Sequence, residues 1–248
     1  MNYLRLLMLP LLCSFFSVAS ANEKSSEITA GVKENKRIVI GVAGVNNKDR
    51  PFRLGVKVLK EISQRTGYEM KLISLPVKRA KVMLDRGEID ADLARVKEFS
   101  NYNDSVIMVK EPIAKIPFHA YSTNKDLRLA DIKSKKDLRI VAIRGQVFPQ
   151  TYFKDYEILL TNSIRSGFWF LHKNRADIFV AEGTSAQTTA DILELEKLGI
   201  YKLSPPLAVV DAYTFFSAGN ADIAKEYERA LIEIKKEGIY DKIFEETK

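Results

Sequence analysis

Two charged side chains, Arg95 and Glu182, each follow a short apolar segment that ends in alanine. In both places a leucine, Leu84 or Leu171, stands six residues before the aspartate that opens this segment. An arginine can hold a planar carboxylate through two hydrogen bonds, and a glutamate can accept hydrogen bonds from an ammonium group. The pattern therefore predicts a site for a small polar or charged molecule, with Arg95 and Glu182 as ligand-binding residues.

The elements that would position these two residues occur in two similar sets. In the first half the patterns predict strands at 37–42, 69–75 and 90–94, with helices at 54–66 and 77–86. In the second half they predict strands at 138–143, 157–160 and 177–181, with helices beginning at 149, 163 and 185. A second likeness joins Arg37-Ile38-Val39, which leads to Gly44, with Arg139-Ile140-Val141, which leads to Gly145. Alternating strands and helices are typical of an α/β fold, here with two lobes, each a mostly parallel sheet flanked by helices.

Two β-rich segments, 116–122 and 209–217, predict strands that cross between the lobes, and helices follow at 223–236 and 240–245. The predicted organisation is lobe 1 at 37–115 and 209–248, lobe 2 at 122–205, and a two-strand hinge at 116–121 and 206–208. Open α/β sheets bind ligands beyond the carboxyl ends of their strands. We therefore expect the site between the lobes, closing by bending at the hinge.

The first 21 residues have the features of a secretory signal peptide cleaved after Ala21. Arg5 is the only charge, an apolar run covers Leu6–Val18, and Ala19-Ser20-Ala21 follows. That run is shorter than the roughly 20 residues a spanning helix needs. Residues 22–36 are polar and aperiodic, which predicts a flexible leader. The expected location is the periplasm.

The sequence contains few arrangements of residues that support catalysis. Cys13 is the single cysteine and lies in the predicted signal peptide, so the secreted part is expected to have no disulfide or thiolate site. His119 and His172 lack metal-ligand spacing, and no nucleophile elbow or phosphate-binding loop occurs. The 39 basic residues are scattered among 32 acidic ones, and the densest run, 133–136, is expected on a surface turn. We expect no catalytic residue, metal, cofactor or nucleic-acid partner, and a monomer.

Four stretches together resemble the periplasmic solute-binding proteins of the polar amino acid importer type, the family 3 extracellular solute-binding proteins. They are Gly87–Ala91, Asp131–Ile140 leading to Gly145, Asn174–Asp177, and Ala230–Ile243. The resemblance covers 37–246 and implies a two-lobed fold of the type II periplasmic-binding-protein kind. It also implies a ligand trap without chemistry of its own, serving the membrane permease of an ABC-type importer.

The chain departs from that family where an amino acid would be held. The family's Thr-x-x-Arg segment reads Arg95-Val96-Lys97-Glu98, and its Gly-Thr pair at the second lobe's anion-binding turn reads Gly145-Gln146. The resemblance gives Glu182 the position whose carboxylate receives a ligand ammonium group. The chain is therefore expected to be a compact, divergent variant.

Helix starts and aromatic side chains supply the other candidates. Backbone N–H groups at a helix start can bind an anion, and ligand clefts are mostly apolar. The further predicted ligand-binding residues are Arg144, Gly145, Gln146, Arg79, Phe52, Phe148 and Tyr213. Trp169 stands at core spacing with Phe168 and Leu171, so it is expected to pack in the interior.

Two other functions stay open. The same closing lobes could form a ligand-sensing module for a membrane sensor protein. Secreted dehydratases that act on prephenate-like substrates are similar to this fold, and there Glu182 would serve as a general acid.

Overall fold

The computed structural model describes residues 36–102, 105–135 and 137–247. The predicted signal peptide and residues 22–35 of the predicted leader lie outside the described residues. These described residues belong to one unit, which spans 34–248. In this part of the chain, no helix combines the length and the apolar character that crossing a bilayer requires.

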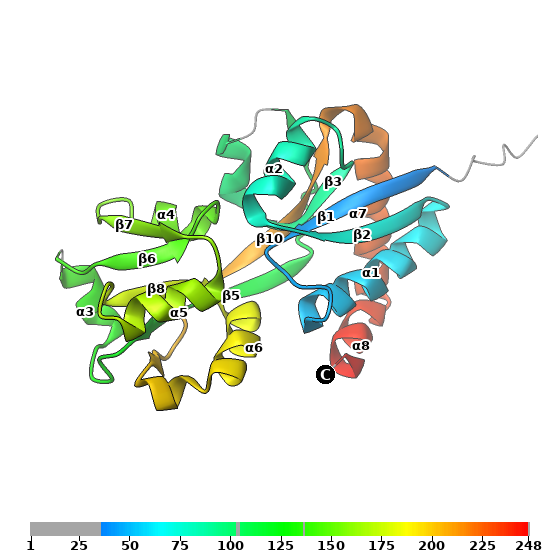
Figure 1. The fold of residues 1–248 in the computed structure, drawn as a ribbon. Helices are drawn as coiled ribbons and strands as arrows, with labels where there is room; N and C mark the ends of the chain where they lie inside the picture. Colours follow the sequence, from blue (N-terminus) through cyan, green and yellow to red (C-terminus); the bar gives the residue numbers. More distant parts are fainter. Residues whose placement is uncertain (1–35, 103–104, 136, 248) are drawn as a thin grey trace, which may run out of the picture. The chain divides into compact units, whose positions relative to one another are not determined.

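The first half of the chain builds one lobe, in which helices pack on a mostly parallel sheet (Figure 1). Its elements are β1 (Arg37–Ala43), α1 (Arg50–Thr66), β2 (Glu69–Leu75), α2 (Val77–Asp85), β3 (Ala91–Val96), the 3₁₀ helix η1 (Lys97–Tyr102) and β4 (Val106–Met108). Helix α1 buries Leu54, Val58 and Ile62 on one face and ends at Gly67, whose φ of +74° suits glycine.

The second lobe follows and has the same plan. Its elements are α3 (Leu129–Ser134), β6 (Ile140–Ile143), α4 (Val147–Tyr152), β7 (Ile158–Thr161), α5 (Ile164–His172), β8 (Ile178–Glu182), α6 (Gly183–Leu193), η2 (Leu195–Leu198) and β9 (Tyr201–Lys202). The chain then returns to the first lobe through η3 (Ala218–Asn220), α7 (Ala221–Lys236) and α8 (Ile239–Glu246).

Two long strands, β5 (Ala114–Ser122) and β10 (Ala208–Ser217), join the lobes and run side by side between them (Figure 1). The strand order is β2-β1-β3-β10-β5-β8-β6-β7. From each edge inward it follows one scheme: β2-β1-β3 are parallel and meet antiparallel β10, and β7-β6-β8 are parallel and meet antiparallel β5. The predicted two-lobed α/β fold is confirmed.

The registers define which residues of the two lobes correspond. Asp90 accepts the N–H of Val39, and Asp177 accepts the N–H of Arg139, both at 2.8 Å. Asp177 lies 87 positions after Asp90, so this offset relates equivalent residues at the starts of β3 and β8. The first strands, β1 and β6, have a different offset. Val39 corresponds to Arg139, so the likeness between 37–39 and 139–141 noted in the sequence is displaced by two residues.

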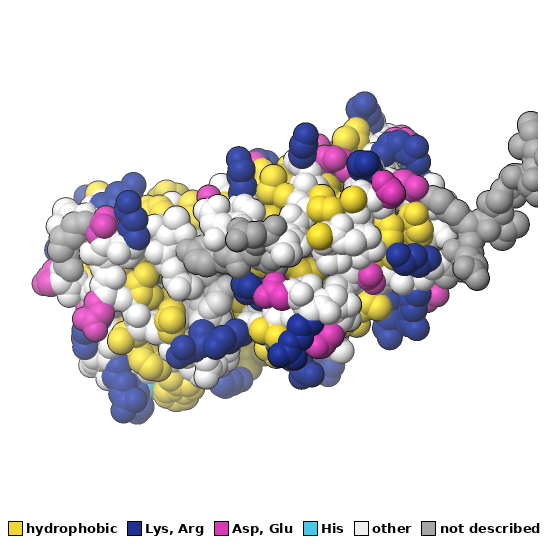
Figure 2. Space-filling view, turned by 90° about the horizontal axis from the view of Figure 1, so that it is seen from above, with side chains coloured by type: hydrophobic (Ala, Val, Ile, Leu, Met, Phe, Trp, Pro, Cys, Tyr) yellow, Lys and Arg dark blue, Asp and Glu magenta, His cyan; other side chains and the backbone are white. Residues whose placement is uncertain are grey.

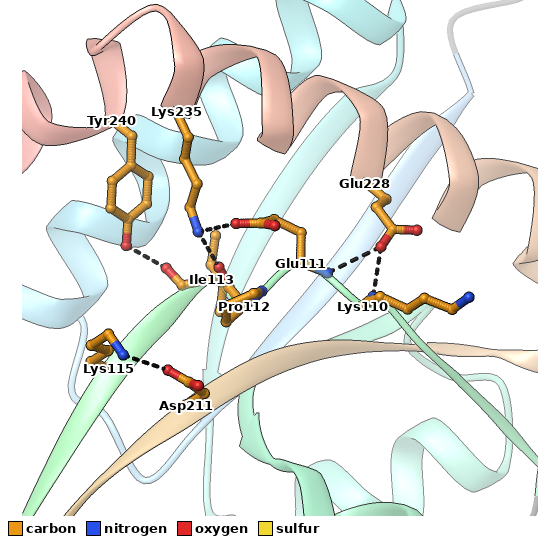
Figure 3. A network of polar contacts seen from close by, with 9 residues as sticks. All are labelled: Lys110, Glu111, Pro112, Ile113, Lys115, Asp211, Glu228, Lys235 and Tyr240. Atoms are coloured by element: carbon orange, nitrogen blue, oxygen red, sulfur yellow. Dashed lines mark hydrogen bonds and ion pairs between the residues drawn. The ribbon is translucent and has the colours of Figure 1, made fainter.

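The segment that leads into β5 is fastened to the C-terminal helices (Figure 3). Lys235 on α7 reaches the Glu111 carboxylate and donates to the Pro112 carbonyl at 2.6 Å. Glu228 accepts the backbone N–H groups of Lys110 and Glu111. Tyr240 on α8 donates to the Ile113 carbonyl. The chain is therefore held to lobe 1 up to the first residue of β5.

One expectation about the second lobe is wrong, and another is right in part. Trp169 is 40% exposed, with the Lys173 ammonium 5.8 Å above its ring, because Phe168 and Leu171 occupy the buried face of α5. The basic run expected on a surface turn does lie at the surface, with Lys133 and Lys135 exposed, but it begins inside α3 and not on a turn. On the face that Figure 2 shows, basic side chains are scattered, with acidic side chains between several of them.

Candidate functional site

A cleft of about 870 Å³ lies at the carboxyl ends of the strands of both lobes. Lobe 1 contributes the loop after β1, the start of α2 and the end of β3. Lobe 2 contributes the loops after β6 and β7 and the start of α6. The apolar part of the lining includes Leu54, Phe99, Phe118, Phe148 and Ile192. The volume and the mostly apolar wall suit a small organic ligand.

Arg95 lies on this wall, and one side of its guanidinium already donates hydrogen bonds within the protein. Its Nε donates to Asp92 at 2.7 Å, one Nη donates to the Val77 carbonyl at 3.1 Å, and the guanidinium lies 4.8 Å from the Phe99 ring centre. Arg95 is 8% exposed and Asp92 is fully buried. Burial raises the pKa of the Asp92 carboxyl, and the Arg95 guanidinium opposes that increase. The pair therefore fixes a buried guanidinium at the edge of the cleft.

The backbone just before Arg95 is irregular. Ala94 has a φ of +62°. Between Asp92 and Arg95, two residues of β3 lie opposite a single residue of β10, which is a β-bulge. A bulge of this kind turns the following side chains to the opposite face of the sheet. By sequence spacing Arg95 matches Glu182, but by strand register it takes the position that Ala181 holds in lobe 2.

Glu182 also lies on the cleft wall, where it caps helix α6. Its two carboxylate oxygens accept the backbone N–H groups of Thr184 and Ser185, each at 2.7 Å. These N–H groups would otherwise lack a partner at the helix start, and the helix dipole favours a negative charge there. The carboxylate therefore has a structural role, which is to cap α6.

Three other predicted residues line the cleft: Arg144, Gln146 and Phe148. The Arg144 Nε donates to Asn162 at 3.3 Å, and Phe148 stacks on Phe118 with ring centres 4.3 Å apart. The binding role of each stays a prediction.

The remaining four predicted residues are not among those that line the cleft. Phe52 packs against the lobe 1 core, and Tyr213 packs against the cluster around Phe99 and Phe215. Arg79 is exposed on α2. Gly145, with a φ of +89°, is covered by α2: a Cβ there would lie 3.1 Å from Val77. Aromatic type and helix-start position alone did not reveal which way these residues face.

The cleft lining includes five basic residues that were not predicted, namely Lys48, Arg50, Lys78, Lys115 and Arg165. Two of these, Lys78 and Arg165, hold corresponding places in the two lobes. Each is the second residue of its helix, α2 in lobe 1 and α5 in lobe 2. They are 87 positions apart, so they correspond in the repeat. Extending the leucine-to-aspartate match six residues backward from Leu84 and Leu171 would have found them.

The described residues contain no group of three or more His, Cys, Asp or Glu side chains placed to hold a metal ion. The acids that line the cleft are Asp49 and Glu182. Asp49 accepts the N–H of Asn46 at 3.0 Å, so both acids already bind backbone amides. This geometry lends no support to Glu182 as the acid of a dehydratase.

No family model matches the chain. An uncharacterized protein of Shewanella oneidensis is 20% identical over 201 residues, which cover 77% of this chain and 72% of that protein. Three solved structures are similar over their length. An ancestral arginine-binding protein bound to glutamine has a TM-score of 0.68 at 17% identity, covering 86% of this chain and 98% of its own. The substrate-binding protein of an amino acid ABC transporter has a TM-score of 0.65 at 16% identity, covering 85% and 98%.

A histidine kinase sensor domain with similarity to periplasmic binding proteins has a TM-score of 0.70 at 13% identity, covering 86% of this chain and 96% of its own. At these identities the likenesses show the fold. This chain therefore has the two-lobed fold of periplasmic binding proteins, and its structural neighbours named here are ligand-binding proteins and a sensor domain.

Proposed function

We propose that this chain is a periplasmic solute-binding protein that captures a small polar or charged ligand between its lobes by hinge closure. The observation that carries the proposal is the cleft of about 870 Å³, whose lining comes from both lobes at equivalent strand ends. The ligand-binding character of the structural neighbours supports it.

The hinge is proposed at the ladder between 114–118 of β5 and 208–212 of β10. Within this ladder the described residues 115–117 and 209–211 pair only with one another, whereas β5 also pairs with β8 from Phe118 onward and β10 also pairs with β3 from Ala212 onward. Because the segment before β5 is fastened to α7 and α8, bending is expected beyond Ile113. A ligand stabilises the closed form only if it gains contacts there, so both walls must contribute.

In the closed form, the protein would present the surface that a membrane partner recognises. An ABC-type importer is the first candidate, in keeping with the neighbour that serves an amino acid ABC transporter. A membrane sensor protein is the second candidate, which the similarity to a histidine kinase sensor domain supports.

Closure can be measured with spin labels on the chain without residues 1–21, which has no native cysteine. Lys60→Cys on α1 and Glu196→Cys on η2 are exposed positions in different lobes. Thermal-shift screening of amino acids, polyamines, organic acids and sugars supplies a stabilising ligand. We expect that ligand to shorten and narrow the distance distribution between the labels.

The matched control places both labels in lobe 1, at Lys60→Cys and Lys71→Cys, where the distance should stay constant. A ligand that raises Tm while leaving the distance between lobes unchanged would contradict hinge closure. A screen in which no compound raises Tm would contradict ligand capture.

A further inference from the structure

We propose that the ligand is an organic acid with two carboxylates and no ammonium group, held between a basic side chain of each lobe. This inference rests on the proposed function and names the ligand class of the same cleft. It differs from an amino acid ligand, which needs an acidic group free to receive the ammonium.

The first support is the corresponding pair Lys78 and Arg165. Both line the cleft, each from the first turn of its helix, and both are exposed. Among the described residues, neither side chain has a hydrogen-bond or ion-pair partner. The helix starts add backbone N–H groups that favour an anion beside each base. Two cations that line one cleft from different lobes suit a ligand with a negative charge at each end.

The second support is the buried guanidinium of Arg95. Asp92 and the Val77 carbonyl occupy its Nε and one Nη hydrogen, so the other three N–H donors have no acceptor among the described residues. The side chain is 90% buried and lines the cleft. Burial strengthens a charge-assisted hydrogen bond to a carboxylate, because little water competes for the donors.

The third support is the charge balance of the wall. The basic residues that line the cleft are Lys48, Arg50, Lys78, Arg95, Lys115, Arg144 and Arg165, against the acids Asp49 and Glu182. Lys115 is paired with Asp211, and Arg50 binds the carbonyls of Phe244 and Thr247. Even without these two, bases outnumber acids. Glu182 uses both oxygens to cap α6, and Asp49 already accepts the Asn46 N–H with one oxygen, so each acid of the described lining has a backbone partner that an ammonium group would have to compete with.

The apolar part of the cleft lining indicates the form of the ligand. Phe99, Phe118 and Phe148 line the same cleft as the two bases. Apolar side chains suit the methylene chain of a dicarboxylate and disfavour a compact inorganic anion, which leaves them in contact with water. The expected ligand is therefore a linear dicarboxylate and not free phosphate.

The test titrates the chain without residues 1–21 with succinate, glutarate and adipate, by calorimetry and thermal shift. Inorganic phosphate, L-glutamine and L-arginine are the comparison probes. We expect at least one dicarboxylate to raise Tm and to bind at least tenfold more tightly than every comparison probe. We also expect its affinity to fall as the salt concentration rises.

Two single variants, Lys78→Gln and Arg165→Gln, should each weaken dicarboxylate binding roughly tenfold or more, because each removes one charge-assisted contact. The matched control is Arg175→Gln, which removes one exposed positive charge outside the cleft lining. It should leave the affinity nearly unchanged. If Arg175→Gln weakens binding as much as the two cleft variants, the effect belongs to net charge and the inference is overturned.

The outcomes separate this inference from the proposed function. If L-arginine, L-glutamine or phosphate binds at least as tightly as every dicarboxylate and brings the lobe labels together, the ligand class is wrong and capture by closure stands. If dicarboxylates bind but the labels do not approach, the ligand class stands and hinge closure fails. Absence of binding by the whole dicarboxylate series overturns the inference.

Discussion

The ends of β3 and β8 are corresponding places in the two lobes, but the charged residue at each end has a different role. At the end of β3, a bulge at Ala94 turns Arg95 inward, where Asp92 holds it in a buried pair. At the end of β8 the strand is regular, and Glu182 caps the helix that follows. One lobe thus presents a fixed cation to the cleft, while the other satisfies its acid within itself. The two lobes therefore share a fold, but the charged residue at the strand end differs between them in both register position and role.

The largest effect is expected at the buried pair. Asp92→Ala leaves the Arg95 guanidinium buried without its partner, and breaking such a pair costs about 3–5 kcal/mol of unfolding free energy. Urea unfolding followed by circular dichroism measures the change. Replacing both partners, with Asp92→Leu and Arg95→Met together, should recover much of the loss. A cost below about 1 kcal/mol for Asp92→Ala would mean that Arg95 does not depend on this pair.

Local patterns carried most of the fold. Strand β2 has the predicted bounds, 69–75, because alternation and the following Pro76 mark both ends. Helix α7 begins two residues before its prediction and ends where predicted, since its apolar spacing is regular. Strands β4 and β9 were missed because three and two residues are too short to show a period.

The details of the site depend on contacts that local patterns do not contain. The bulge at Ala94 exists because of how β3 pairs with β10, which lies more than 100 positions further along the chain. Asp92 lies in a predicted strand, and the local sequence does not indicate that its carboxylate is buried beside Arg95. Glu182 stands at a predicted strand end, and its capping role depends on the immediate start of α6, which had been expected at 185. The repeat nevertheless contained Lys78 and Arg165.

The bulge itself can be tested by one substitution made in both lobes. Ala94→Gly relieves a left-handed conformation that costs an L-residue roughly 1–2 kcal/mol, against about 0.5–1 kcal/mol for the freer unfolded glycine. The variant should therefore be as stable as the native chain or more stable by up to about 1 kcal/mol. Ala181→Gly, at the regular and fully buried position of β8, should lose about 1 kcal/mol. Equal losses in both variants would show that β3 has no bulge.

An effect of similar size is expected at the cap, and it tests whether the charged residues at the two strand ends have different roles. Glu182→Ala removes both acceptors at the start of α6, which should cost about 1 kcal/mol, and amide exchange at Thr184 and Ser185 should become faster. Glu182→Gln keeps one acceptor oxygen and should lose less.

The Glu182→Ala variant also tests a binding role of Glu182. If Glu182 received a ligand ammonium, Glu182→Ala would weaken binding by roughly tenfold or more. A dicarboxylate held by Lys78 and Arg165 should instead bind as tightly as before, or a few-fold more tightly, because the variant removes a negative charge from the same cleft. Weaker dicarboxylate binding together with unchanged amide exchange at α6 would indicate that Glu182 contacts the ligand and does not cap the helix, which would contradict the proposed difference between the lobes.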